Sequence, residues 1–247
     1  MRVFVNEKKV AFRKRLASIA SFVGLGVLIL GMLITLRVKP TDPRYGLWIA
    51  IALAALMLGF IAAQVGNYNM RRFVGVRLKG AGHAQRPDTV LDKHLKGLDD
   101  KYEVYHWLLP ADHVILGPAG LFVVVLRHTT DPVIARGDKW RQPFSFRRLL
   151  GLFGAEGLGD PVGEALSQTE KLRAWLQKEA PDLVVDIQPL VFFLEPVPIT
   201  RENPTVPALL PKDLKKYLRT RAREKPLNEE TRRRLRDLFR KKVEADE

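Results

Sequence analysis

The side chains best suited to chemistry lie at the two ends of one apolar run, ADHVILGPAGLFVVVLRH. Asp112 and His113 stand near its start, and Arg127 and His128 close it. Carboxylate and imidazole groups can bind metal ions or transfer protons. The chain contains no cysteine, which excludes disulfides, thiolate metal sites and cysteine nucleophiles. Any chemistry here therefore depends on carboxylates and basic side chains.

Each of these residues also has a purely structural interpretation. Asp112 could accept a hydrogen bond from the backbone amide of a turn or a strand end. His113 alternates with Asp112 and is more typical of a surface or packed histidine than of a metal ligand. The guanidinium of Arg127 could form an ion pair instead. Its candidate partners are Asp88, Asp112 and Glu164.

The elements around these residues follow an α/β pattern. Apolar spacing predicts helices, and short apolar runs bounded by turn residues predict strands. The strand LFVVVLR is apolar up to its final residue, Arg127, which predicts burial on both faces. Asn228 is a plausible N-cap for the last helix. We expect helices over 89–98, 161–179, 212–223 and 229–243, and strands over 102–109, 111–116, 121–127 and 184–194.

The central run resembles the NERD (nuclease-related) domain, a branch of the PD-(D/E)XK nuclease-like fold. That core reads as an Asp-His pair, a short strand, Gly-Pro-x-Gly, and a strand ending Glu-x-Lys-Asn. The later segment DPVGEALSQTEKLRAWL resembles the family's Asn-Pro-x-x-Gln helix. The resemblance covers roughly the middle half of the chain, residues 87–200. It implies a restriction-endonuclease-like α/β domain.

The resemblance also implies a metal-dependent site, which this sequence matches only in part. Two carboxylates would share a divalent ion, usually Mg²⁺, beside a lysine that orients the attacking water. Asp112 matches the Asp, but Val125 stands in place of the Glu and Arg127 in place of the Lys. The other correspondences are His128 for the Asn, Asp88 near an upstream Glu, and Asp160 and Glu164 for the Asn and Gln of the helix.

Val125 is the decisive departure, because valine cannot bind a metal ion. Arg127 keeps the positive charge but does not exchange a proton near neutral pH. A carboxylate supplied from elsewhere could rescue the site, with Glu164 or Asp131 as candidates. We therefore expect a relic catalytic site at Asp112, Arg127 and Glu164, with no cofactor. Asp112 would bind Mg²⁺ only if the site is active.

Two apolar stretches near the N-terminus predict a transmembrane hairpin over residues 16–66. No charged residue lies between Leu16 and Leu36 or between Tyr45 and Met70. Each stretch is long enough to cross a hydrocarbon core of roughly 30 Å. We expect the two helices at about 16–36 and 46–65. A signal peptide for the first stretch, or two buried helices of a soluble core, are the alternatives.

The net charge of +14 is unevenly distributed. Residues 1–86 hold 14 Lys or Arg against 2 acids, residues 87–200 hold 12 against 16, and residues 201–247 hold 15 against 9. The positive excess thus lies in a basic N-terminus (1–15), a basic juxtamembrane linker (71–86) and basic C-terminal helices (201–247). This distribution favours a membrane surface over a nucleic-acid cleft. The residues expected to contact the membrane surface are Arg13, Lys14, Arg15, Arg71 and Arg72.

The excess of Lys and Arg outside the hairpin loop predicts that both termini are cytoplasmic. We expect an integral membrane protein of a prokaryotic plasma membrane that acts as a non-catalytic interaction or scaffold module. Its partners would be the lipid bilayer and an unidentified protein. The alternative is a membrane-associated, Mg²⁺-dependent nuclease or nucleic-acid-binding protein.

Overall fold

The computed structural model describes residues 1–143 and 157–246. Residues 144–156, part of the expected 87–200 domain, lie outside the described residues. The chain divides into two compact units. One is a helical hairpin made of residues 7–77 and 83–86. The other is an α/β domain made of residues 1–6, 78–82 and 87–247.

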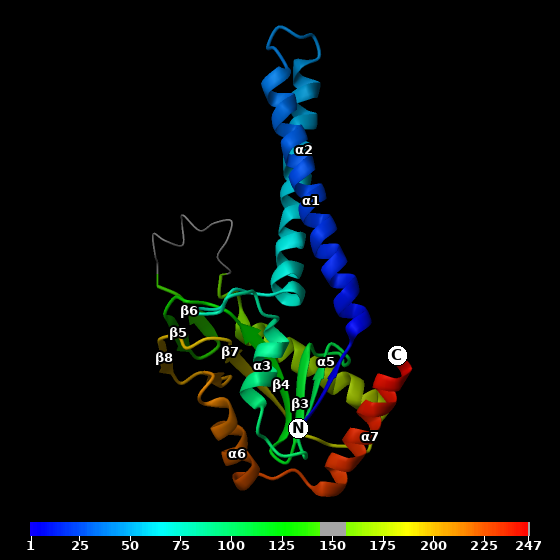
Figure 1. Cartoon of the computed structure of the whole chain (residues 1–247), viewed down its shortest axis with the longest axis vertical. Helices are drawn as coiled ribbons and strands as arrows, with labels where there is room; N and C mark the ends of the chain where they lie inside the picture. Colours follow the sequence, from blue (N-terminus) through cyan, green and yellow to red (C-terminus); the bar gives the residue numbers. More distant parts are fainter. Residues whose placement is uncertain (144–156, 247) are drawn as a thin grey trace. The chain divides into compact units, whose positions relative to one another are not determined.

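The hairpin consists of α1 (Glu7–Arg37) and α2 (Tyr45–Asn69), which continues into a π-helical turn, η1 (Met70–Val74). The two long helices lie side by side and are joined by a short loop (Figure 1). The expected helices are confirmed, but both are longer than predicted. The polar residues that precede and follow the apolar stretches also continue the helices, so charge alone does not end them.

Small residues occupy most of the fully buried positions between the two helices. In α1 the buried positions recur every seven residues, as they do in α2 until its last turn. Such a seven-residue repeat keeps one seam of each helix facing its neighbour. A Cβ atom on Gly59 would lie 2.9 Å from the carbonyl oxygen of Gly24, so these backbones touch. The buried residues are Val10, Ala17, Gly24 and Gly31 in α1, and Ala52, Gly59, Gly66 and Asn69 in α2.

The large apolar side chains of the hairpin point outward. Phe22 is 76% exposed and Leu36 is 73% exposed. Both helices are long and apolar enough to cross a membrane. A core helix of a soluble protein would bury such side chains, whereas lipid-facing helices bury small residues between them. The exposure pattern therefore favours membrane helices over the soluble-core alternative.

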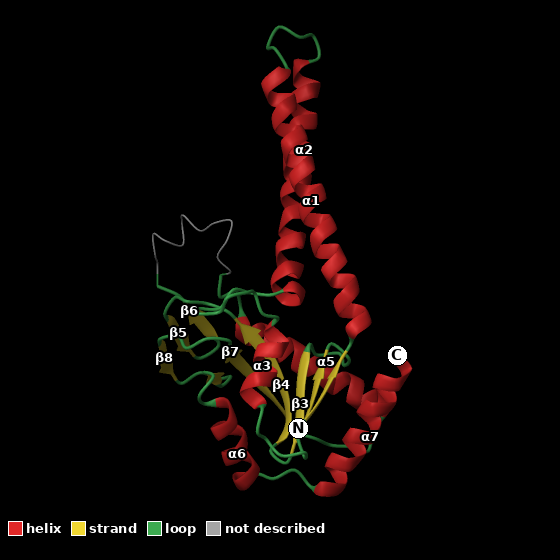
Figure 2. Cartoon of the chain, viewed as in Figure 1, coloured by secondary structure: helices red, strands yellow, loops and turns green. Residues whose placement is uncertain are grey.

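The α/β domain is built on a mixed six-stranded sheet in the order β1-β2-β3-β4-β7-β9 (Figure 2). The antiparallel neighbours are β2 with β3 and β3 with β4, and the other neighbours are parallel. β4 lies inside the sheet, and nearly all its residues are buried, as its sequence predicted. The strands are β1 (Arg2–Val5), β2 (Glu103–His106), β3 (His113–Gly117), β4 (Gly120–Arg127), β7 (Ile187–Phe193) and β9 (Ala208–Leu209).

Helices cover both faces of this sheet. α5 (Pro161–Glu179) and α7 (Glu229–Asp246) pack with Val123, Leu121 and Tyr105 in one core. The other face is covered by α3 (Pro87–Leu95) and α6 (Leu214–Glu224). His94 of α3 packs against Phe192, and Tyr217 of α6 packs against Phe122. The Asn228 side chain accepts a hydrogen bond from the amide of Glu230 at 2.9 Å, as expected of an N-cap. The domain is thus a three-layered, mixed α/β unit.

A second, three-stranded sheet in the order β6-β5-β8 was not predicted. Its strands are short, and most of their outward residues are polar, so the sequence gives only a weak strand signal. The strands are β5 (Val133–Arg136), β6 (Lys139–Arg141) and β8 (Ile199–Glu202).

The domain boundaries also differ from those expected at both ends. Residues 1–15 are not a separate basic segment, because Arg2–Val5 forms the edge strand β1 and Glu7 already begins α1. β1 pairs with β2 across a sequence separation of about a hundred residues, from Arg2 with Glu103 to Val5 with His106. Residues 201–247 likewise belong to the domain, since Leu235 and Phe239 of α7 are fully buried in its core. The hairpin is therefore an insertion within the α/β domain.

Candidate functional site

The topology of the sheet brings the candidate residues together at one end of its central strands, β3 and β4. β3 runs antiparallel to β4, so the start of β3 and the end of β4 meet there. Asp112 directly precedes β3, and the register extended by two residues places it opposite Val125. Arg127 ends β4, and α5 begins nearby with Glu164 in its first turn. Residues from three segments of the chain thus share one site.

Arg127 is held on several sides. Its guanidinium forms an ion pair with the carboxylate of Glu164. The Nε atom also donates to the carbonyl oxygen of Leu158 at 3.1 Å, and a terminal nitrogen donates to that of Leu126 at 3.0 Å. Of the three partners proposed for Arg127, the structure thus selects Glu164. Because the arginine is buried and its donors are engaged, it serves as a structural cation at this site.

Gln168, one helical turn after Glu164, joins the two carboxylates. Its Nε2 atom donates to Asp112 Oδ2 and to Glu164 Oε1, each at 3.1 Å. Its Oε1 atom accepts the backbone amide of Asp112 at 2.9 Å. The reverse orientation of the amide would place its oxygen against two carboxylates, so the network fixes this one. An amide nitrogen thus stands between the carboxylates, where a shared cation would otherwise bind.

Val125 belongs to the hydrophobic core at this edge. It is 2% exposed and packs in a cluster with Ala165, Val191 and Phe193. Within residues 1–143 and 157–246, no three acidic or histidine side chains are grouped so that they could hold a metal ion. Val125 therefore supplies no ligand here, and the carboxylate that lies near Asp112 is that of Glu164, one of the two candidates for a replacement.

Other carboxylates named from the sequence serve different purposes. Asp160 caps α5 by accepting the amide of Gly163 at 2.8 Å. Asp88 is fully buried at the start of α3. Asp131 lies in the loop before β5, where its own backbone amide bonds to the hydroxyl of Thr129 at 3.2 Å. The contacts found in the described part of the chain do not connect Asp131 with the Asp112 network.

The two histidines of the motif pack as structural residues. His113 is buried, and its Nδ1 atom lies 2.8 Å from Nδ1 of His106. His106 in turn reaches Asp92 at 3.1 Å through Nε2. His128 bonds to the buried carboxylate of Glu195 at 3.1 Å. His113 is therefore a packed histidine in a hydrogen-bonded chain, in agreement with its structural interpretation.

The basic residues expected at a membrane surface gather at one end of the hairpin. Arg13 of α1 approaches Asn69 of α2, with 3.5 Å between a guanidinium nitrogen and the amide oxygen. The guanidinium of Arg72 lies 4.9 Å from the ring centre of Tyr68. Lys14 and Arg15 follow Arg13 in α1, and Arg71 belongs to η1. The antiparallel pairing therefore brings both basic clusters to the open end of the hairpin.

Sequence reasoning identified three of the four residues of the network and missed Gln168. Its spacing of four from Glu164 places both side chains on one helix face, which was the available signal. Chemically, Gln168 donates hydrogen bonds to Asp112 and Glu164, and Arg127 balances the charge of Glu164. Comparison of the chain with protein-family models, with curated proteins and with solved structures gives no match.

Proposed function

We propose that this protein is a membrane-anchored, non-catalytic interaction module with a NERD-like, restriction-endonuclease-like domain. The observation that carries the proposal is the hydrogen-bonded network that joins Asp112, Gln168, Glu164 and Arg127. Glu164 is paired with Arg127, and the amide of Gln168 bridges Glu164 to Asp112. A metal ion would have to displace this amide and would compete with Arg127 for the Glu164 carboxylate. We therefore assign these residues a structural role and no role in hydrolysis.

The order of elements supports the nuclease-like fold. Along the chain, α3 is followed by β2, β3 and β4 of the main sheet, by β5 and β6 of the second sheet, and then by α5 and β7. The order of a helix, a β3–β4 hairpin, a helix and a strand is the one that the resemblance implies. The register places Asp112 opposite Val125 at the edge where the motif would assemble its ligands. We therefore interpret the domain as one that kept this scaffold after losing a ligand.

The insertion of the hairpin supports a defined topology in the membrane. The chain leaves β1 at Val5, passes through α1 and α2, and returns to the same sheet at β2. If both helices span the bilayer, both termini lie on one side. The basic residues at the open end of the hairpin favour the cytoplasmic side, and a prokaryotic plasma membrane is the setting we propose.

The nuclease alternative is tested with the full chain in detergent, because a fragment starting at residue 71 would lack β1. We expect no Mg²⁺- or Mn²⁺-dependent cleavage of DNA or RNA above that of Asp112→Ala. Calorimetric titration should likewise detect no Mg²⁺ binding that depends on Asp112. Cleavage that disappears in Asp112→Ala would replace our proposal with the membrane-associated nuclease.

The topology is tested by cysteine labelling, for which a chain without native cysteine is well suited. Single variants Arg2→Cys, Thr41→Cys and Lys178→Cys would be exposed to a membrane-impermeant maleimide in sealed vesicles of known orientation. We expect Arg2→Cys and Lys178→Cys to be labelled from the cytoplasmic face and Thr41→Cys from the opposite face. Labelling of all three from one face would contradict a spanning hairpin.

A further inference from the structure

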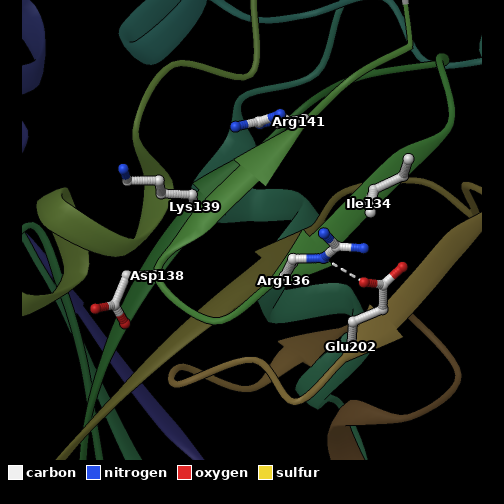
Figure 3. A pocket seen from close by; sticks show the side chains of 6 residues that line it. All are labelled: Ile134, Arg136, Asp138, Lys139, Arg141 and Glu202. Carbon is white, nitrogen blue, oxygen red and sulfur yellow. Dashed lines mark hydrogen bonds and ion pairs between the residues drawn. The ribbon is translucent and has the colours of Figure 1, made fainter.

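The three-stranded sheet carries a charged hollow on its outer face (Figure 3). Its volume is about 500 Å³, which suits a small molecule or a single side group. Side chains of all three strands and of the turn between β5 and β6 surround it. These residues are Ile134, Arg136, Asp138, Lys139, Arg141 and Glu202.

The register of the strands fixes how these side chains lie. Arg136 of β5 stands between Lys139 of β6 and Glu202 of β8. Ile134, the next outward residue of β5, lies opposite Arg141. The inward residues Val133, Ala135 and Trp140 belong to the core beneath, so the sheet forms a firm platform. Side chains on packed strands are positioned more accurately than those on loops.

The charges on this platform are not balanced within it. Arg136 and Lys139 are directly opposite each other, and like charges in that relation destabilise a sheet. Glu202 forms an ion pair with Arg136. Within the part of the chain that the structure describes, the side chains of Lys139 and Arg141 have no ion pair or hydrogen bond. Figure 3 shows Asp138 pointing away from these cations. Two unmatched positive charges therefore border the hollow.

We propose that this hollow binds a phosphate monoester. The guanidinium of Arg141 can donate two parallel hydrogen bonds to a phosphoryl group, and Lys139 adds a second charge. A phosphate monoester approaches two negative charges at neutral pH, which matches the two unmatched cations. Half-buried Ile134 offers an apolar contact for the group that the phosphate esterifies. Glu202 and Asp138 flank the hollow, which disfavours a long polyanion such as nucleic acid.

The experiment uses the full chain in phosphatidylcholine nanodiscs and phenyl phosphate as the probe. Calorimetric titrations at constant ionic strength compare it with inorganic phosphate and with NaCl. We expect phenyl phosphate to bind more tightly than inorganic phosphate, because only the ester contacts Ile134. Arg141→Gln and Lys139→Gln should each weaken binding about tenfold, the loss expected for a charged hydrogen bond. Lys171→Gln, an equal charge change at an exposed position of α5, should leave affinity unchanged.

The variant Glu202→Gln tests whether phenyl phosphate binds in this hollow or is attracted only by the positive charge of the whole protein. It removes the competing carboxylate and releases Arg136, so the affinity for phenyl phosphate should increase several-fold. Equal binding by Arg141→Gln and Lys171→Gln, or no binding beyond that in NaCl, would overturn the proposal. Its failure would leave the proposed relic site untouched, because no residue is shared between them.

The same phosphate chemistry occurs in soluble metabolites and in lipid headgroups. Nanodiscs that contain phosphatidic acid distinguish these sources once the site has been established. If phosphatidic acid in the discs lowers the apparent affinity of the unsubstituted protein for phenyl phosphate, the lipid headgroup competes for the site. The affinity of Arg141→Gln should then be the same in discs with and without phosphatidic acid. Unchanged affinity identifies a soluble phosphate ester.

Discussion

The hairpin and the α/β domain follow opposite packing rules. In α1 and α2 the buried residues are mainly glycine and alanine, while Phe22 and other large apolar side chains are exposed. In the domain the fully buried side chains include Tyr105, Phe192 and Phe239, and the helices present charges outward. The difference is the one expected of two units adapted to different solvents. Water drives large apolar groups inward, whereas lipid exerts no such drive and favours close backbone contact.

The two units also tolerate change differently. The hairpin should be sensitive to added volume at its glycine seam and insensitive to substitutions on its apolar exterior. The domain should be sensitive to lost contacts in its core and to lost partners in its buried polar network. The following variants test this contrast, in order of decreasing expected effect.

Phe4→Pro should cause the largest loss, because it removes both packing and pairing from β1. The ring of Phe4 stacks on Tyr105 with centres 5.1 Å apart, and the register directs its amide toward β2. We expect a loss of about 3 kcal/mol in the free energy of unfolding of the domain. Urea denaturation of the full chain in detergent, followed by near-ultraviolet circular dichroism, measures it.

Val3→Pro is the matched control for this variant. The amides of Arg2 and Asn6 bond to Tyr102 and His106, so alternate residues of β1 face β2 and the amide of Val3 points to the open edge. Proline is tolerated where an edge strand donates no hydrogen bond. Equal destabilisation by both variants would show that β1 does not pair as described.

Gly59→Leu should separate the hairpin helices. A Cβ at this position would lie 2.9 Å from the backbone nitrogen of Leu28, and backbone cannot move aside as a side chain can. We expect a loss of about 2 kcal/mol, within the range for overpacked positions. Unfolding in SDS, together with hydrogen exchange of α1 and α2, provides the measurement. Gly26→Leu should have no such effect, because nothing lies within 4 Å of its Cβ position.

Gln168→Leu should leave the carboxylates of Asp112 and Glu164 without their shared donor. Hydrogen bonds to charged groups contribute about 2 kcal/mol, so we expect a loss of this size in the free energy of unfolding. Thermal unfolding of the full chain in detergent gives the comparison, with the exposed Gln177→Leu of the same helix as control. If both variants unfold at the same temperature, the amide bridge does not hold the site together.

Substitution of His94 should have the smallest effect, which is a change in how the free energy of unfolding depends on pH. Burial against the sheet, with the nearby charges of Lys215 and Lys93, lowers the pKa of its imidazole below the usual 6.5. The unfolded chain then binds a proton more readily than the native state. The free energy of unfolding should therefore fall as pH decreases through 6.5 toward the lower native pKa, and level off below it. His94→Gln should reduce this slope, whereas His83→Gln at an exposed position should not.

Local sequence signals predicted the elements whose periodicity is strong. The helix over 161–179 has the predicted bounds, and the strand over 121–127 is buried on both faces. The short strands β5, β6 and β8 escaped prediction, because a few alternating residues do not distinguish a strand from a loop. The candidate site was only partly foreseen. The motif marked Asp112, Arg127 and Glu164, but hydrogen bonds between separate segments decided which of them pair.

The sequence by itself determined that this chain carries two apolar helices and an α/β domain, with a valine at the position where the nuclease motif that it resembles has a glutamate. These properties depend on residue type and near-neighbour spacing, which are local. Only the tertiary structure decided that Arg2–Val5 joins a strand about a hundred residues away and that Gln168 bridges Asp112 to Glu164. It also placed Lys139 and Arg141 beside one hollow. Such arrangements depend on long-range strand pairing and helix packing, which no local pattern encodes.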